Sequence, residues 1–405
     1  MVTEKERLRL RDLAKQQLEL AESEYNKKLY KDWEIHGKTD NTGRPMITVE
    51  MDTFADEFVS PLLVNQNNEA RDLERQLVQG IFHAENIRDD TIIRNYIGVC
   101  DEYALLPFGL EVKREESGSL GHHFISQVRD LAGDFHVLGK SNIYKRSGAQ
   151  AAEFIGDMIG DILPVKKIFY PRTICLLQDI VHIMDMEDMY IAMYEEPELF
   201  HKMCAMLTDD YLEMLSRTEA EGLIMVTNGD IHLWQGSLCF TDDLPHEGSG
   251  LKTSQIWCYM DAQEAQGISG AMYHEFVYPY VKRISERFGL LSYGCCEGVD
   301  RFWDDLATLE NMRKVSVSAW SNEEFIGEVL KGRKTVYHRK PAPNYIGVDR
   351  YLDEEKLRAS IRKTVQCAEG ITLEFSQRDV YTAHNDIAKV ARYVEIIREE
   401  CQNKR

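Results

Sequence analysis

The chain has 405 residues, with 48 basic and 68 acidic side chains and a formal net charge of −20. Hydrophobic residues make up 43% of it, which is enough to bury a large core and argues against a disordered polymer. So large an acid excess argues against partners such as nucleic acid or anionic lipid, because both need clustered Lys and Arg. The N-terminal residues lack the apolar core of a signal peptide, and no run approaches the roughly 20 apolar residues that span a bilayer. We therefore expect a cytoplasmic enzyme that makes no membrane contact.

The order of predicted elements indicates the fold class. Residues 3–31 form a polar, helix-period segment, and a β-like run follows at 46–51. Apolar runs of strand length then alternate with longer helix-period segments. The strand candidates are 173–177, 223–227, 290–293, 315–318, 335–338 and 371–375, and the helix candidates are 195–220, 271–288, 323–330 and 354–368. This alternation predicts an α/β fold, namely a single (β/α)8 TIM barrel over residues 41–405 with a helical N-terminal extension over 1–40.

The longest irregular stretch spans residues 227–259. Because it follows a strand candidate directly, we expect it to lie over the active-site face of the barrel, with Asp230 and Trp234 lining a substrate pocket. The alternative is a surface excursion with a small core of its own.

The strongest local signal is the string Tyr-Gly-Cys-Cys-Glu at 293–297. It places two thiols and a carboxylate at the end of a strand candidate, but zinc needs at least three protein ligands, so two packed cysteines are an equal alternative. The other cysteines stand singly, which does not suggest a disulfide scaffold. Upstream, Asp261, Gln263 and Glu264 precede a turn, where they supply either a helix-entry loop or a ligand or general base.

Polar residues also follow the later strand candidates. Arg339 and Lys340 come after 335–338 and suit a carboxylate or phosphate of a ligand, unless they are ion-paired loop residues. Asp379 follows the last strand candidate. The adjacent His122 and His123 are candidates for lining a pocket, because neighbouring side chains diverge and make a weak metal signal.

Taken together, these motifs resemble a known family. The strings Ala-Gln-Glu at 262–264, Gly-Ile-Ser at 267–269 and Tyr-Gly-Cys-Cys-Glu at 293–297 resemble the uroporphyrinogen decarboxylase superfamily. The continuations at 313–320 (RKVSVSAW) and 339–343 (RKPAP) look like a bacterial branch associated with corrinoid-dependent methyl transfer in anaerobes. The likeness is best over about residues 220–395, and it implies a single (β/α)8 barrel.

The sequence also departs from this family. The arginine-rich signature that porphyrinogen decarboxylases use is absent from the corresponding stretch at 44–58, which argues against haem synthesis. The methyltransferases of the family bind zinc through a His-x-Cys pair and a later Cys. Here the His is missing, and the last strand candidate ends in Ser-Gln-Arg-Asp at 376–379. Substitute ligands would have to come from Glu264, Glu297, Asp379 or the second thiol.

The resemblance implies a methyltransferase that moves a methyl group between a small methylated or methoxylated molecule and the cobalt of a separate corrinoid protein. Zinc is an open cofactor prediction, and the oligomeric state stays open, a homodimer included. The predicted catalytic residues are Glu264, Glu297 and Asp379, the predicted metal ligands are Cys295, Cys296 and Glu264, and the predicted substrate-binding residues are Arg339, Lys340, His122, His123, Asp230, Trp234, Gln263 and Tyr293. A metal-free decarboxylase or lyase acting on a small acid is one alternative. A non-catalytic barrel that binds a corrinoid protein or small ligand is another.

Overall fold

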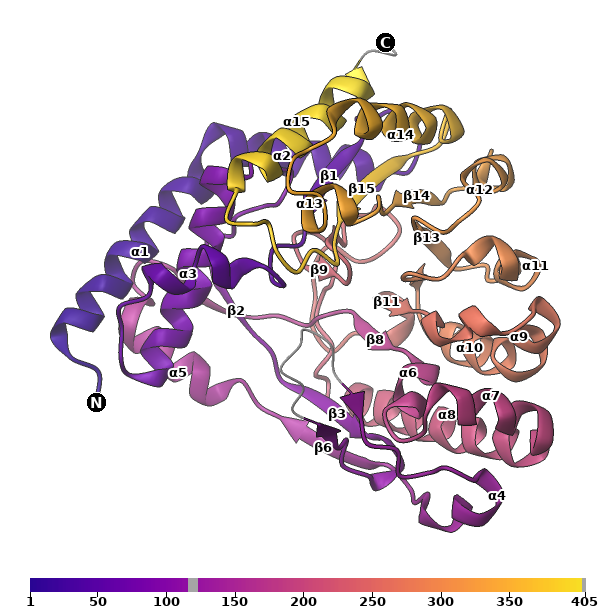
Figure 1. Cartoon of the computed structure of the whole chain (residues 1–405). Coiled ribbons are helices and arrows are strands. Elements are labelled where there is room, and N and C mark those ends of the chain that lie inside the picture. The colour runs from indigo at the N-terminus through magenta and orange to yellow at the C-terminus, as the bar shows by residue number, and fades with distance from the viewer. Residues whose placement is uncertain (116–122, 403–405) are drawn as a thin grey trace.

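The computed structural model describes residues 1–115 and 123–402 and has the predicted α/β class (Figure 1). Its main feature is a parallel sheet of seven strands in the order β1-β15-β14-β13-β12-β11-β8. These strands are β1 (Met46–Val49), β8 (Arg172–Ile174), β11 (Trp257–Met260), β12 (Leu290–Tyr293), β13 (Met312–Val317), β14 (Val336–Arg339) and β15 (Leu373–Gln377). Small two-stranded sheets pair β2 (Ile97–Val99) with β7 (Val165–Lys167), β3 (Glu102–Leu106) with β6 (Asn142–Arg146), β4 (Arg114–Glu115) with β5 (His123–Phe124), and β9 (His232–Leu233) with β10 (Ser237–Leu238).

Helices occupy most of the connections between strands. They are α1 (Glu4–Glu22), α2 (Glu24–Gly37), α3 (Asn68–Asn86), α4 (Leu131–Asp134), α5 (Ala149–Ile159), α6 (Leu176–Val181), α7 (Met186–Glu195), α8 (Pro197–Ala220), α9 (Gly270–Phe276), α10 (Tyr278–Ser285), α11 (Trp303–Leu306), α12 (Glu323–Leu330), α13 (Asn344–Gly347), α14 (Glu354–Cys367) and α15 (Ile387–Gln402). The predicted helix at 323–330 and strand at 290–293 have these bounds in the structure. Within the described residues, no helix combines the length and apolar character that crossing a membrane requires.

The N-terminal segment is helical, as predicted. α1 begins with a capping box, in which the side chains of Thr3 and Glu6 bond each other's backbone amides. Leu10, Leu13 and Ala14 are buried in the same hydrophobic core as the sheet. Whether residues 1–40 form a unit of their own stays a prediction.

The main sheet is strongly curled. Cys295 follows β12 and Arg378 follows β15, and β13 and β14 lie between these two strands. Neighbouring strands lie about 4.8 Å apart, so a flat sheet would separate the two strand ends by about 14 Å. Nevertheless, Arg378 Nη1 donates to Cys295 Sγ at 3.5 Å. The sheet therefore bends toward its own concave face, as the wall of a barrel does.

The curl does not close into a barrel, which corrects the predicted eight-stranded closure. Among the described residues, β1 and β8 end the sheet and do not pair with each other. The free edge of β1 is covered by side chains, because the amide of Val49 donates to Asp89 Oδ2 at 2.6 Å and that of Ile47 donates to Asp90 Oδ2 at 2.7 Å. These carboxylates take the hydrogen bonds that another strand would take.

The predicted irregular stretch at 227–259 contains a strand of the main sheet. The predicted strand at 223–227 forms only an isolated bridge, between Met225 and Ser249. β11 takes its place in the sheet, with all four of its residues buried. A short, wholly apolar run of this kind has no periodicity that marks it as a strand.

The hairpin β9–β10 lies against the concave face of the sheet. Gln235 donates its side-chain amide to the Tyr259 hydroxyl of β11. A Cβ at Gly236, whose φ is +80°, would lie only 3.1 Å from Thr48 Oγ1 and 3.2 Å from Ser376 Oγ, so this close approach requires glycine. Lys314, near the start of β13, donates to the Leu238 carbonyl at 3.0 Å. The hairpin thus lies in the concave interior of the sheet, and its tip reaches Tyr259 near the carboxyl end of β11. That the stretch 227–259 covers the active-site face stays a prediction.

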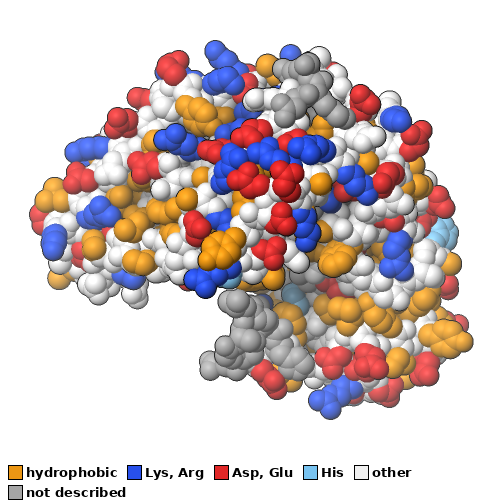
Figure 2. All heavy atoms as spheres, turned by 45° about the horizontal axis from the view of Figure 1, so that its top comes forward, with side chains coloured by type: hydrophobic (Ala, Val, Ile, Leu, Met, Phe, Trp, Pro, Cys, Tyr) orange, Lys and Arg blue, Asp and Glu red, His pale blue; other side chains and the backbone are white. Residues whose placement is uncertain are grey.

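A band of paired charges joins the two helices at the C-terminal end of the chain. Figure 2 shows neighbouring basic and acidic side chains on the face formed by α14 and α15. Arg358 pairs with Glu399 at 2.5 Å and with Glu400 at 2.8 Å, and Arg392 pairs with Glu354 at 2.8 Å. The acid excess of the chain is thus locally balanced where these helices meet.

Asp90→Ala tests the covered edge of β1. Asp90 is fully buried and pairs with Arg44 and Arg398, each at 2.8 Å. Removing one partner of such a buried pair costs about 3–5 kcal/mol, so we expect a loss of this size in the free energy of unfolding measured in urea. Asp12→Ala removes an exposed partner of Lys15 and should cost about 0.5 kcal/mol or less. Equal losses in the two variants would contradict the proposed role of Asp90.

Candidate active site at the carboxyl edge of the sheet

Chemically active side chains gather where the parallel strands end. Asp261 follows β11, Cys295 and Glu297 follow β12, Lys340 follows β14 and Arg378 follows β15. The carboxyl ends of parallel strands meet at one edge of a curled sheet, which is where such folds place their active sites. The sequence predicted Cys295, Glu297 and Lys340 here, and the structure brings them together.

Alternation along β14 decides which of the predicted cations reaches this edge. His338 faces the concave side, where Nε2 lies 2.7 Å from Ser376 Oγ, and Arg339 points the other way. The guanidinium of Arg339 binds Glu323 of α12 at 3.1 Å and the Val317 carbonyl at 3.0 Å. Arg339 therefore lies outside the site, and its predicted substrate-binding role is corrected to that of a buried link between sheet and helix.

Two other predicted substrate-binding residues also lie elsewhere. The hydroxyl of Tyr293, on the helix-covered face of β12, is 2.6 Å from that of Tyr273 in α9. Asp230 accepts from Tyr30 at 2.6 Å and from Tyr96 at 2.8 Å. The prediction for Tyr293 is corrected, because its side chain is fully buried. Asp230 is half-buried and lines a different hollow, so its role stays a prediction.

The two adjacent cysteines differ in charge. Cys296 Sγ lies 3.6 Å from Cys295 Sγ and 3.4 Å from Asp379 Oδ2. The hydrogen bond from Cys296, followed by the cations Lys340 and Arg378, lowers the pKa of Cys295 to about 7. The same hydrogen bond and burial raise the pKa of Cys296. Of the two thiols, Cys295 is thus the one that ionises near neutral pH, and Cys296 is the donor.

Two buried glutamates keep their protons near neutral pH. Glu297 is fully buried, and its carboxyl accepts from the amides of Ala262 at 3.1 Å and Cys295 at 2.7 Å. Burial, followed by the negative charge of Asp261, raises the pKa of both Glu297 and Glu264 to about 8. Glu264 Oε2 is buried and, among the described residues, has no hydrogen-bond partner. Two of the three predicted catalytic residues are therefore buried carboxylic acids, whereas the third, Asp379, is partly exposed beside Cys296.

The structure adds Arg378 to the predicted site and places Asp261, one of the candidates for a ligand or general base, at the end of β11. Asp261 Oδ2 accepts from the Tyr259 hydroxyl at 2.8 Å, and burial raises its pKa. Arg378 pairs with Glu50, at the end of β1, at 3.0 Å. A correct prediction of β11 would have marked Asp261 as a residue at a strand end.

The remaining predicted residues fall at the margin or outside the described part. Gln263 begins a 3-10 turn (Gln263–Gly267) and is half-buried. Trp234 is 53% exposed, with its ring 6.4 Å from that of Tyr259. His122 and the side chain of His123 lie outside the described residues. Their predicted roles stay predictions.

The donor set at this edge does not fit the zinc that the resemblance implies. In the part of the chain that the structure describes, no three His, Cys, Asp or Glu side chains are grouped so that they could hold a metal ion. The cations Lys340 and Arg378 act on the Cys295 thiolate, and like charges at such range repel. Zinc at Cys295, Cys296 and Glu264 thus stays a prediction of the resemblance alone.

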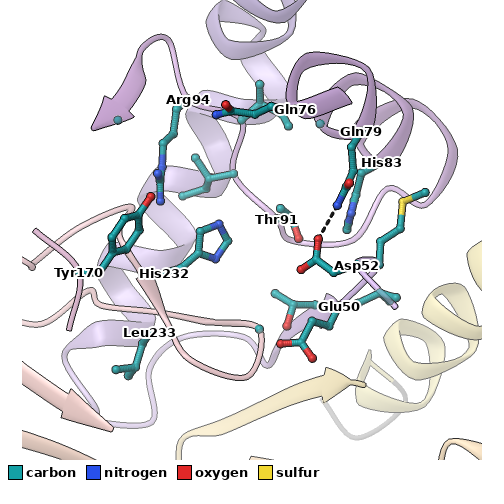
Figure 3. Close-up of a pocket in the computed structure, with 18 of the residues that line it drawn as sticks. Glu50, Asp52, Gln76, Gln79, His83, Thr91, Arg94, Tyr170, His232 and Leu233 are labelled. Atoms are coloured by element: carbon teal, nitrogen blue, oxygen red, sulfur yellow. Dashed lines mark hydrogen bonds between the residues drawn. The ribbon is translucent and has the colours of Figure 1, made fainter. Parts of the chain in front are cut away.

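A cavity of about 620 Å³ opens beside this edge, in the region between β1 and the hairpin β9–β10 (Figure 3). Glu50 lies in its wall and also pairs with Arg378. Cavity and strand-end cluster are therefore neighbours.

The comparisons with known proteins give little guidance. No protein-family model and no curated protein matches the chain. Among solved structures it is similar to a methyltransferase from Methanosarcina mazei, with a TM-score of 0.46 and 11% identity, over 87% of this chain and 93% of that one. So distant a likeness carries no conclusion about the chemistry of this chain.

Glu264→Gln tests the buried acid through the pH dependence of stability. The pKa of Glu264 rises from 4.5 to about 8 on folding, so between these values the folded chain holds more protons than the unfolded one. The free energy of unfolding then falls as the pH rises. We expect the variant to lose less stability from about pH 5.5 to 7.5, by about 1 kcal/mol per pH unit, in urea unfolding. The exposed control Glu369→Gln should follow the wild type, and a variant with the wild-type slope would argue against a proton on Glu264.

Metal analysis tests the donor set. Because two cations face Cys295, we expect protein purified without chelator to carry zinc well below one equivalent. Chelation should leave its melting temperature unchanged. Stoichiometric zinc in the wild type that is lost in Cys296→Ala would contradict this expectation and support the ligand set that the resemblance implies.

Proposed function

We propose that the protein is a methyltransferase of a corrinoid-dependent system, which moves a methyl group between a small methylated or methoxylated molecule and a separate corrinoid protein. The sequence resemblance at 262–297 supports the class of reaction. The observation that carries the proposal is the pair of buried acids, Glu264 and Glu297, which hold protons near neutral pH at the carboxyl edge of the sheet. When bound, the partner's corrinoid supplies the cobalt centre that exchanges the methyl group.

The two acids suit the difficult part of this reaction. Loss of a methyl group from oxygen or nitrogen leaves a basic atom that departs poorly unless it receives a proton. A general acid works best when its pKa lies near the working pH, as burial arranges for these two groups. Glu264 Oε2 is buried and has no partner among the described residues, so its proton is not committed to another group of the protein. Glu264 is therefore the proposed proton donor, and Glu297 holds the amides of Ala262 and Cys295 in place.

The cations have a separate role. Lys340 is buried, with Nζ 3.4 Å from the Gly294 carbonyl, and burial lowers its pKa. Lys340 and Arg378 balance the Cys295 thiolate and provide positive charge for an acidic group on the substrate.

These cations also favour a second candidate function, a decarboxylase or lyase acting on a small carboxylic acid. In that reaction Lys340 and Arg378 would hold the substrate carboxylate, and Glu264 would protonate the carbon left by carbon dioxide. The two reactions require the same residues but release different products.

Methyl transfer to free cob(I)alamin tests the proposal and separates the candidates. With a panel of methoxyaromatics and methylamines, we expect methylcobalamin to form, followed by its absorbance. The rate should fall above about pH 8, as Glu264 deprotonates, and Glu264→Gln should lower kcat by about 100-fold. The exposed Glu369→Gln is the matched control.

Carbon dioxide release from small acids, without methylcobalamin, would instead support the decarboxylase. The absence of both activities would leave a non-catalytic binding protein.

A further inference from the structure

The cavity of about 620 Å³ is outside the proposed chemistry and carries an inference of its own. Its volume falls within the range of roughly 300–1,000 Å³ that is usual for small-molecule sites. Figure 3 shows Arg94, Tyr170 and His232 on one side and Glu50, Asp52 and Gln79 on the other, with open space between them. The two sides differ in charge.

The first side carries the cation Arg94, whose pKa is raised by its neighbours Tyr96 and Asp230. Arg94 donates through Nε and Nη2 to the backbone carbonyl of Asp230, at 3.2 and 2.6 Å. Among the described residues no carboxylate forms an ion pair with Arg94, although it is half-buried. A cation removed from water in this way is stabilised by an anion, so this side suits the carboxylate of a ligand.

His232 lies on the same side and faces the cavity. Surrounding protein, followed by the charge of Arg94, lowers its pKa to about 4, so the imidazole is neutral near neutral pH. The residue is nevertheless exposed, and it forms part of the cavity wall. In the described part of the chain, neither ring nitrogen has a hydrogen-bond partner. The imidazole can therefore donate to the same ligand carboxylate.

The opposite side carries the carboxylate Asp52, and the imidazole of His83 in the same wall pairs with Asp89 at 3.0 Å. Asp52 Oδ1 accepts from Gln79 Nε2 at 2.5 Å, and within the described residues no Lys, Arg or His pairs with it. Glu50 lies beside it in the wall and already pairs with Arg378. This side suits a cationic nitrogen. The exposed rings of Tyr170 and Trp234 also line the cavity and offer apolar surface to the body of a ligand.

We propose that this cavity binds a zwitterion of the amino-acid class, with its carboxylate at Arg94 and His232 and its cationic nitrogen at Asp52. A dicarboxylate would place like charge against Asp52, and a polyamine would place it against Arg94. The apolar surface favours an apolar side chain. The proposal does not rest on methyl transfer, because binding requires neither catalysis nor a corrinoid partner.

Calorimetric titration of the full chain with L-leucine tests the proposal against two analogues that each lack one charge. These are 4-methylpentanoate, which lacks the amine, and isoamylamine, which lacks the carboxylate. We expect L-leucine or its N-methylated forms to bind at least about tenfold more tightly than either analogue, since each charged contact contributes about 1–3 kcal/mol. Absence of binding by every zwitterion at millimolar concentration, or equal affinity for the three compounds, would overturn the proposal.

Variants assign the two ends of the site. Asp52→Asn should weaken binding of L-leucine about tenfold and leave 4-methylpentanoate unchanged, and His232→Ala should weaken binding of both. Arg94→Gln is less informative, because Arg94 also holds the Asp230 carbonyl. Asp242→Asn, in the wall of a different hollow, is the control and should bind as the wild type does. Unchanged L-leucine affinity in both Asp52→Asn and His232→Ala would place the ligand elsewhere and refute the assignment.

Discussion

Two carboxylates on the edge of β1 determine the shape of the molecule. Asp89 and Asp90 accept the amide hydrogens of Val49 and Ile47 that a neighbouring strand would otherwise bind. Each buried carboxylate has a basic group beside it, because His83 lies 3.0 Å from Asp89 and two arginines pair with Asp90. The edge is thereby closed to further pairing, and β2 pairs with β7 instead. The last residues of β1, Thr48 and Val49, line the cavity on this side of the sheet.

Buried carboxyl groups serve two opposite purposes in this fold, and their neighbours decide which. At the edge of β1 the charge of His83 helps to lower the pKa of Asp89, which stays ionised and accepts backbone amides. At the carboxyl edge of the sheet, Glu264 and Glu297 face another carboxyl group, Asp261, and their pKa rises to about 8. The cations Lys340 and Arg378 at that edge act on the Cys295 thiolate. A buried carboxyl group is thus an ionised hydrogen-bond acceptor at the edge of β1 and a protonated acid at the carboxyl edge of the sheet.

The sequence predicted features that depend on neighbouring residues, and it did not predict features that depend on contacts between distant segments. Alternation of apolar runs and helix-period segments predicted the α/β class, and position after a strand brought Cys295, Glu297 and Lys340 to one edge. The predicted substrate-binding roles of Arg339 and Tyr293 were wrong, because a shift of one residue along a strand moves a side chain to the other face of the sheet. Composition does not reveal this register. The edge bonds of Asp89 and Asp90 could not be predicted either, because they join a loop to a strand about 40 residues away. β11 and the hairpin were missed since their roles depend on contacts with distant strands.

The strand-end cluster and the cavity share one ion pair, and this pair couples them. Glu50 stands in the cavity wall and binds Arg378, whose guanidinium also donates to Cys295 Sγ. A cationic nitrogen held at Asp52 would lie on the same side of the cavity as Glu50 and would compete with Arg378 for the Glu50 carboxylate. Arg378 would then direct more of its charge to the thiolate, so that an occupied cavity would favour the ionised form of Cys295. The open side of the sheet, created by two aspartates, would in this way influence chemistry at its carboxyl edge.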